Sequence, residues 1–169
     1  MDIKVGILTL SDKGSRGERE DISGKVIHEI VQTIGGKVEQ YDIIPDEVDL
    51  IKEYLVRYAD ENELDLIVTT GGTGLAKRDV TPEATLAVID QEIPGMAEEM
   101  RKVSREKTPY AMLSRAVVGS RKNSIIINLP GSPKGVRENL EAVIKVVPHA
   151  LEILQGKMGE HPKGFEASS

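Results

Sequence analysis

The sequence predicts an α/β fold of three layers, in which helices cover both faces of a mostly parallel sheet that also carries one antiparallel hairpin. Aliphatic runs without polar alternation, such as Ile3–Leu10, are typical of strands that are buried on both faces. Amphipathic helical segments alternate with these runs, and such alternation produces a parallel sheet. The apolar runs 116–119 and 124–129 flank a short polar turn, a pattern that favours the hairpin.

The first strand and the first helix are separated by a polar segment. Ile3–Leu10 is the expected strand, and residues 11–21, SDKGSRGERED, are too polar to pack, so a mobile loop is expected there. Apolar residues then recur at helical spacing. Gly35 and Gly36 follow as a stop, so a helix is predicted over 23–34.

The same alternation continues through the middle of the chain. A second strand is predicted over 38–44, where Pro45 ends it, and Asp46 is a candidate N-cap for the helix that follows. The predicted apolar face of that helix consists of Val48, Ile51, Leu55 and Tyr58. A third strand is predicted over 64–70 and ends in the glycine-rich sequence TGGTG.

Prolines mark the starts of the later helices. Thr81 is the expected N-cap, and Pro82 the expected first residue, of a helix that continues to about residue 89. Pro94 opens a helical stretch, Pro133 starts another, and Pro148 precedes a short last helix. Each proline is tolerated there because the first turn of a helix leaves N–H groups without an intrahelical partner.

Length and composition limit the classes of protein. The 169 residues predict one domain over 1–156, followed by a flexible tail over 157–169 that lacks apolar periodicity. The chain has no cysteine, which excludes disulfides, thiolate metal sites and a cysteine nucleophile. Its net charge of −6 and single Phe predict no nucleic-acid partner, and its apolar runs are too short to span a membrane. A cytoplasmic location is expected.

The glycine-rich loop after the third strand is the strongest local signal. Ligands of parallel sheets bind beyond the carboxyl ends of the strands, where this loop is expected to lie. Gly71, Gly72 and Gly74 let backbone N–H groups approach an anion closely, so a phosphate or a planar heterocycle is expected here. A tight turn without a ligand is the alternative. The loop matches neither the GxxxxGK[ST] phosphate loop nor the GxGxxG dinucleotide loop.

Three carboxylates are expected at the same edge of the sheet. Asp12 follows the first strand, Asp46 the second, and Asp79 the glycine-rich loop. Carboxylate oxygens without His or Cys partners suit Mg²⁺, which retains waters and bridges to substrate phosphates. Two alternatives stay open. In the first, Asp46 is only a helix N-cap, and in the second, Asp79 is only a turn residue.

Basic residues and serines accompany these carboxylates. The basic residues in or beside the candidate loops are Lys13, Arg16, Arg19, Lys77, Arg78, Lys134 and Arg137. They suit an anionic ligand despite the negative net charge, and a solvated rim of mixed charge is the alternative. Ser132 precedes Pro133 and is either a helix cap or a contact to phosphate. The three histidines lack the spacing of metal ligands.

Six segments taken together resemble a known family. In chain order they are LTLSDKGSRGEREDISG, IPDE, TTGGTGLAKRDVTPEAT, IPGMAEEMR, MLSRAVVG and INLPGSPKGVRENL. The set resembles the MogA family of molybdopterin adenylyltransferases, which includes the G domains of gephyrin and of its plant counterpart, over residues 4–156. The resemblance implies the fold of the molybdenum-cofactor-biosynthesis domain. It also implies transfer of AMP from ATP to the molybdopterin phosphate, with Mg²⁺ required and pyrophosphate released.

The family pattern implies roles for individual residues. Asp46 and Asp79 match its two essential carboxylates, which are expected to organise Mg²⁺ and the reacting phosphates. The residues that match its nucleotide site are Ser11, Asp12, Pro130, Gly131 and Ser132. The residues that match its molybdopterin site are Gly71, Gly72, Thr73, Gly74, Ser104 and Ser114.

The resemblance also implies partners. A homotrimer is expected, with residues 93–113 as the candidate interface, together with a downstream molybdotransferase that receives the product. The related MoaB proteins share TGGTG, RDVT and LPGSP. A MoaB-type protein that binds molybdopterin or acts as a scaffold without catalysis therefore stays the alternative.

The polar segment after the first strand is expected to act as a lid. Residues 12–21 lie where the nucleotide site is expected, and Lys13 and Arg16 are placed to meet triphosphate oxygens. We therefore expect the segment to be mobile without ATP and ordered with it. A surface loop without a role is the alternative.

Overall fold

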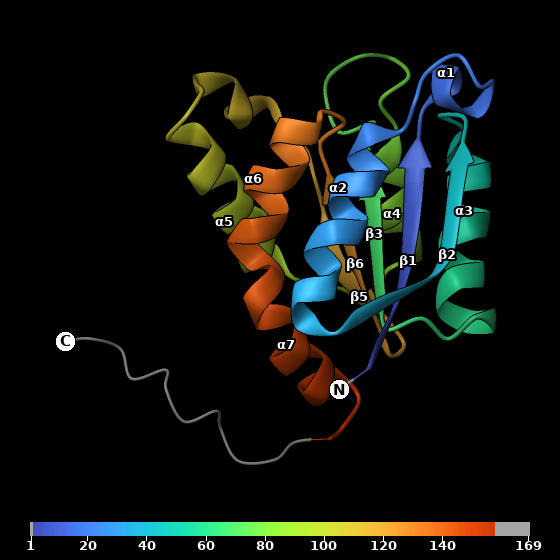
Figure 1. Cartoon of the computed structure of the whole chain (residues 1–169), viewed down its shortest axis with the longest axis vertical. Coiled ribbons are helices and arrows are strands. Elements are labelled where there is room, and N and C mark those ends of the chain that lie inside the picture. Colours follow the sequence, from blue (N-terminus) through green and yellow to red (C-terminus); the bar gives the residue numbers. More distant parts are fainter. Residues whose placement is uncertain (1, 158–169) are drawn as a thin grey trace.

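The computed structural model describes residues 2–157 and has the three layers that the sequence predicts (Figure 1). A six-stranded sheet with the order β2-β1-β3-β6-β5-β4 forms the middle layer. The strands are β1 Ile3–Leu10, β2 Gly36–Ile44, β3 Leu66–Thr70, β4 Gln91–Glu92, β5 Val118–Arg121 and β6 Ser124–Leu129. The tail predicted over 157–169 falls, apart from Lys157, outside the described residues.

The sheet is parallel at its centre and antiparallel at one edge. Strand β1 pairs in parallel with β2 and β3, and β3 pairs in parallel with β6. Strand β5 pairs antiparallel with β6, which confirms the predicted hairpin. The edge strand β4 was not predicted, because two residues carry no detectable alternation. The parallel strands bring their carboxyl ends to the same edge, at the top of Figure 1.

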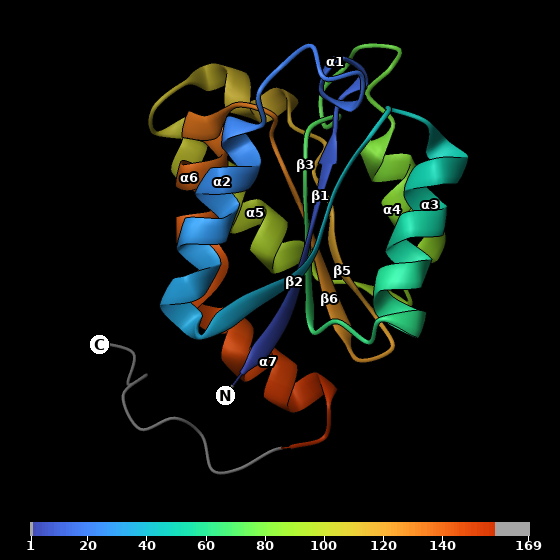
Figure 2. The same ribbon diagram turned by 45° about the vertical axis from the view of Figure 1, so that its right-hand side comes forward.

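Helices cover both faces of the sheet. They are α1 Asp12–Ser15, α2 Ile22–Val31, α3 Val48–Val56, α4 Thr81–Val88, α5 Pro94–Arg105, α6 Pro133–Val143 and α7 Val147–Leu154. Helices α2, α5 and α6 lie on one side of the sheet, and α3 and α4 lie on the other (Figure 2). Each layer is held by buried apolar side chains, such as Ile27 and Leu140 on the first side and Ile51 and Leu55 on the second. No helix within residues 2–157 is long and apolar enough to cross a membrane.

Two helices begin differently from the prediction. Glu47, not Asp46, is the N-cap of α3, and it makes no side-chain cap bond. Asp46 does not cap the helix because its carboxylate accepts the backbone N–H of Asp12 instead. Thr81 is the first residue of α4 and not its cap, because its hydroxyl donates to the carbonyl oxygen of Gly71, 2.9 Å away. Both helix starts are therefore fastened to the loops at the carboxyl edge of the sheet.

The polar segment 11–21 is more ordered than the loop that was predicted. It contains the short helix α1, whose N-cap Ser11 accepts the N–H of Gly14. At its far end, Asp21 caps α2 and accepts a hydrogen bond from the hydroxyl of Thr9, 2.6 Å away. Polar contacts at the two ends thus replace the apolar anchor that the sequence lacks.

Candidate active site

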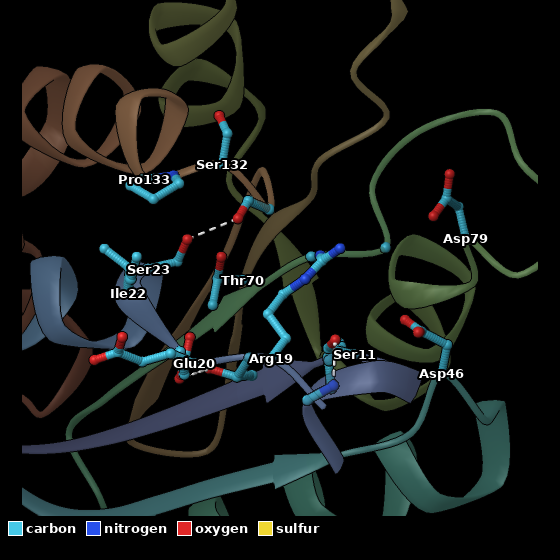
Figure 3. Close-up of a pocket in the computed structure, with 17 residues that line it drawn as sticks. Ser11, Arg19, Glu20, Ile22, Ser23, Asp46, Thr70, Asp79, Ser132 and Pro133 are labelled. Carbon is cyan, nitrogen blue, oxygen red and sulfur yellow. Dashed lines mark hydrogen bonds between the residues drawn. The ribbon is translucent and has the colours of Figure 1, made fainter. Parts of the chain in front are cut away.

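The loops that follow β1, β2, β3 and β6 enclose a cavity of about 530 Å³ at the carboxyl edge of the sheet. Its lining includes seven of the residues predicted for the site, which are Ser11, Asp46, Gly71, Gly72, Asp79, Gly131 and Ser132. In Figure 3, Asp46 and Asp79 lie on one side of this cavity, and the side chain of Arg19 extends between them and Ser23. The cavity therefore combines carboxylates, one cation and glycine backbone.

The glycine-rich loop adopts a conformation that requires glycine. Gly71 and Gly72 have φ angles of 100° and 69°, in the left-handed region that favours glycine. A Cβ on Gly71 would lie 2.4 Å from the carbonyl oxygen of Leu10, and a Cβ on Gly72 would lie 2.3 Å from Oγ1 of Thr81. The loop is thus pressed between the end of β1 and the start of α4.

Backbone donors in this loop are free for a ligand. The N–H of Gly71 donates to the carbonyl oxygen of Leu129, 3.0 Å away, and so joins the loop to β6. Among residues 2–157, the N–H groups of Gly72, Thr73 and Gly74 have no hydrogen-bond acceptor. Successive free N–H groups in a turn form a concave site for an anion.

Asp46 is the more buried of the two predicted catalytic carboxylates. Its Oδ2 accepts the N–H of Asp12 at 3.1 Å, and Oδ1 of Asp12 accepts the N–H of Asp46 at 3.0 Å. Burial raises the pKa of Asp46, and the carboxylates of Asp12 and Asp79 act in the same direction. A negative charge on Asp46 is therefore less favourable than on an exposed aspartate, and a nearby cation would offset this effect.

Asp12 is held by a basic side chain. Arg78 donates from Nε and Nη2 to its two carboxylate oxygens, at 3.1 and 2.8 Å, and also pairs with Glu47 at 3.1 Å. These hydrogen bonds from Arg78 keep the pKa of Asp12 below its usual value. Asp12, which was predicted for the nucleotide site, does not line the cavity. Its contacts with Asp46 and Arg78 instead join α1 to the loops after β2 and β3.

Asp79 closes the turn after the glycine-rich loop and also faces the cavity. Its Oδ2 accepts the N–H of Ala76 at 3.0 Å, as expected of a turn residue. The same oxygen lies 2.9 Å from the position that a Cβ on Gly74 would occupy, and Oδ1 of Asp46 lies 3.3 Å from the corresponding position on Gly72. The two carboxylates therefore flank the glycine-rich loop.

The carboxylates do not form a complete metal cage. Within residues 2–157, no group of three or more Asp, Glu or His side chains is arranged to hold a metal ion. A pair of carboxylates suits Mg²⁺ when phosphate oxygens and waters supply its remaining ligands. Asp46 and Asp79 fit that requirement, because both offer oxygen donors beside a loop with free N–H groups.

A second cavity of about 370 Å³ adjoins the first. The predicted site residues in its lining are Thr73, Gly74, Ser104, Ser114, Pro130 and Ser132. Ser132 lines both cavities, and its Oγ accepts the N–H of Gly135 at 3.1 Å, so it also caps α6, which was one of the two roles that the sequence left open. The predicted residues are therefore divided between two adjoining cavities. Gly71 and Gly72 lie in the first cavity, whereas Pro130 lies in the second.

Arg115 contributes to the site although the sequence argument assigned it no role. Its Nε donates to the carbonyl oxygen of Gly74 and its Nη2 to that of Asp79, both at 2.8 Å. It also forms an ion pair with Glu83. Arg115 thus fixes both ends of the segment that carries Asp79. Its position in MLSRAVVG, one of the six segments, was the available signal.

Known proteins resemble this chain over most of its length. Residues 6–149 match the domain family described as "Probable molybdopterin binding domain". A molybdopterin adenylyltransferase of Helicobacter pylori strain J99 is 47% identical over 168 residues, which cover 98% of this chain and 96% of that protein. The molybdopterin adenylyltransferase of Escherichia coli K12 is 39% identical, with 91% and 86% covered. A solved structure of the molybdopterin biosynthesis enzyme MoaB from Thermus thermophilus has a TM-score of 0.86 and 55% identity, with 91% of this chain and 97% of that chain covered.

Proposed function

Because the chain belongs to the molybdenum cofactor biosynthesis family that contains the molybdopterin adenylyltransferases, we propose that it transfers AMP from ATP to the phosphate of molybdopterin. Pyrophosphate is the second product. The observation that carries this proposal is the pair of adjoining cavities that share Ser132, one of them lined by Asp46 and Asp79. A reaction between two bound phosphates requires such a pair of neighbouring sites.

Each substrate is assigned to one cavity. ATP occupies the larger cavity, where Ser11, Gly131 and Arg19 surround it and the glycine-rich loop receives its phosphates. Molybdopterin occupies the smaller cavity, beside Ser104 and Ser114. The two phosphate groups then meet near Ser132, where the cavities join. The proximity of the reacting atoms supplies a large part of the rate enhancement in transfers of this kind.

The chemistry requires no strong base from the protein. An oxygen of the molybdopterin phosphate, already ionised at neutral pH, attacks the α-phosphorus of ATP. The new bond joins that oxygen to the α-phosphorus, and the bond between the α-phosphorus and the bridging oxygen of pyrophosphate breaks. Charge neutralisation and positioning therefore dominate catalysis. This explains how a chain without cysteine suffices for the reaction.

Asp46 and Asp79 are the residues that would hold Mg²⁺ in the larger cavity. When bound, this ion neutralises part of the charge on the triphosphate and on the departing pyrophosphate. The raised pKa of Asp46 supports this role, because a nearby divalent cation relieves the repulsion from Asp12 and Asp79. The free N–H groups of the glycine-rich loop and the guanidinium of Arg19 bind phosphate oxygens directly.

The proposal extends to the surroundings of the enzyme. We place it in the cytoplasm as a homotrimer that hands its product to a molybdotransferase. Three exposed apolar side chains support an interface within the predicted stretch 93–113, namely Tyr110, Met112 and Leu113. Exposed apolar side chains that lie close together are typical of protein interfaces.

The second candidate function is the MoaB-type alternative that the sequence left open, a protein that binds molybdopterin without turnover. The chain is also similar to a solved structure of a MoaB protein. One experiment separates the two candidates. Purified protein is incubated anaerobically with molybdopterin, ATP and Mg²⁺, and pyrophosphate release is measured together with retention of the pterin. Release of pyrophosphate in step with adenylylated pterin supports the transferase. Retained molybdopterin without pyrophosphate supports the binding protein.

A further inference from the structure

Glu138 on α6 supplies the carboxylate of the smaller cavity. Its side chain is only 12% exposed, and its Oε1 atom is buried without a hydrogen-bond partner among residues 2–157. The ammonium group of Lys107 lies 4.0 Å from that oxygen, beyond hydrogen-bond distance. A buried carboxylate oxygen without a donor costs free energy, so its presence at a cavity calls for an explanation.

The polar side chains of Asn139 and Ser132, on and next to the same helix, have hydrogen-bond partners, whereas Oε1 of Glu138 has none. Asn139, the next residue, donates from Nδ2 to Oγ of Ser104 at 3.0 Å and to the carbonyl oxygen of Gly135 at 2.7 Å. Ser132, at the start of the same helix, caps it. The unsatisfied acceptor is therefore not a sign of loose packing in α6. Because the side chain of Glu138 lines the cavity, a molecule that enters with its own N–H donors can satisfy this carboxylate once the side chain turns toward it.

The cavity also defines the shape of such a molecule. Tyr110, Ala111, Leu113 and Pro130 contribute apolar surface to its lining, which suits a flat ring. A pterin ring carries two adjacent donors, the 2-amino group and N3–H, and its 4-oxo group is an acceptor beside them. A carboxylate is the natural partner for two parallel donors, and the ammonium group of Lys107 is the natural partner for the 4-oxo group.

We propose that Glu138 determines specificity for the pterin ring by accepting hydrogen bonds from its 2-amino group and N3–H. This inference rests on the proposed function, which places molybdopterin in the smaller cavity. Glu138 acts on substrate choice and not on the phosphates, which by the proposed function meet near Ser132, the residue that lines both cavities. A ring with an oxo group in place of the 2-amino group would turn an acceptor toward the carboxylate and be rejected.

The test compares two fluorescent probes, 6-hydroxymethylpterin and 6-hydroxymethyllumazine, which differ in the group at position 2. Their dissociation constants are measured by fluorescence titration with the wild-type chain and with Glu138→Gln. We expect the wild type to prefer the pterin. Glu138→Gln should bind the pterin about 10- to 100-fold more weakly, as loss of a hydrogen bond to a charged group predicts. It should also lose the preference, because its amide N–H donates to the 2-oxo group of lumazine.

Two further variants control for structure. Glu141→Gln removes an exposed carboxylate from the same helix, one that pairs with Arg137, and should leave both dissociation constants unchanged. Glu138→Asp keeps the charge and should keep the preference for pterin while binding more weakly. Glu138→Asp should thus keep the preference for pterin and Glu138→Gln should lose it. A residue with only a structural role would not produce this difference. Thermal melting should show Glu138→Gln at least as stable as the wild type, because an unsatisfied carboxylate is removed.

The outcomes separate this inference from the proposed function. A wild-type chain that forms adenylylated pterin, together with a Glu138→Gln variant that keeps its preference for pterin over lumazine, overturns the inference alone. Equal binding of the two probes by the wild type also overturns it. The proposed function depends instead on product formation by the wild-type chain.

Discussion

Asp46 is the carboxylate of this site whose negative charge is most disfavoured by its surroundings, and Asp79 lines the same cavity. Burial raises the pKa of Asp46, and two further carboxylates near it add to the repulsion. Stability alone would not favour such an arrangement, and perturbed carboxylates in a cleft are typical of functional sites. We therefore propose that Asp46 acts in catalysis and does not serve the fold alone, and we extend the proposal to Asp79 because it lines the same cavity.

The first prediction concerns these two carboxylates. Asp46→Asn and Asp79→Asn keep the size and the acceptor oxygen of each side chain, so the fold and the melting temperature should change little. Turnover should fall on the order of 100-fold or more in each variant, because a charge that positions the cation and phosphates is lost. Steady-state pyrophosphate release measures this effect. Unaltered turnover in Asp79→Asn, with an unaltered melting temperature, would remove that residue from the catalytic set.

The second prediction concerns Gly72, with Gly17 as its control. Both residues have positive φ, at 69° and 73°, but only a Cβ on Gly72 would collide with Oγ1 of Thr81, whereas no atom lies within 4 Å of a Cβ on Gly17. Gly72→Ala should therefore lose about 1–3 kcal/mol more free energy of unfolding than Gly17→Ala. Urea denaturation of both variants measures the difference. Equal losses would show that the glycine-rich loop is less tightly held than its contacts indicate.

The sequence predicted the position of a residue where that position follows from the residue's own segment. It did not predict contacts between segments that are far apart in the chain. The positions of Asp46 and Asp79 at the carboxyl edge follow from their place in the segments after strands. The hydrogen bond between Asp46 and Asp12 joins segments 34 residues apart and left no signal in either segment. Glu138 was missed for the same kind of reason, since its surroundings depend on how α5 and α6 pack.

At the scale of elements, the segment between β1 and α2 is held at its ends and free in its middle. Ser11 caps α1 at one end, and Asp21 bonds to Thr9 at the other. Between them, Arg16 and Glu18 form an exposed ion pair with each other, which contributes little stability. Asp12, near the first end, links the segment to Arg78 and to Asp46. We propose that this segment is a lid whose two ends serve as hinges.

The third prediction is that this lid closes over ATP. Hydrogen exchange of the backbone amides of residues 12–20 should be fast without nucleotide and slower with saturating Mg²⁺-ATP, because Lys13 and Arg16 then meet phosphate oxygens. Residues 48–56 of α3 serve as an internal reference whose exchange should not change. Equal exchange of residues 12–20 in both states would show that the segment is not a lid.

The larger elements were predictable, and the smaller ones were not. Strand β1 and helix α6 carry enough apolar residues at regular spacing for their type to be read from the sequence. Helix α1 has four residues and buries none of them, so it forms through its Ser11 cap and its contact with Arg78 and not through periodicity. The starts of α3 and α4 were misplaced because their candidate caps bond to distant loops instead.

At the scale of the whole molecule, one edge of the sheet collects every segment that the proposed reaction uses. The loops after β1, β3 and β6 meet there, and the N-terminal ends of α2 and α6 point toward the same edge (Figure 1). The hydroxyl of Ser23 in α2 donates to the carbonyl oxygen of Gly131, 2.7 Å away, and so joins two of these segments across 108 positions of the sequence. The fold thus explains how residues so far apart in the chain share a site.

The fourth prediction concerns assembly. The exposed Met112, with 63% of its surface accessible, should be covered in a homotrimer, together with the outer surfaces of Tyr110 and Leu113, which also border the smaller cavity. Sedimentation equilibrium at micromolar concentration should then give a mass near three times the chain mass of 18.5 kDa. Tyr110→Lys together with Met112→Lys should lower that mass. A wild-type mass equal to that of a single chain would refute the trimer.

The central claim, transfer of AMP between two adjoining cavities, is tested most directly by following labelled phosphates. The chain is incubated anaerobically with molybdopterin, Mg²⁺ and ATP labelled at either the α- or the γ-phosphorus, and the products are separated. We predict that the α-label appears in the pterin product and the γ-label in pyrophosphate, in equal amounts. A γ-label on the pterin, or no labelled pterin despite confirmed binding of both substrates, would contradict the account.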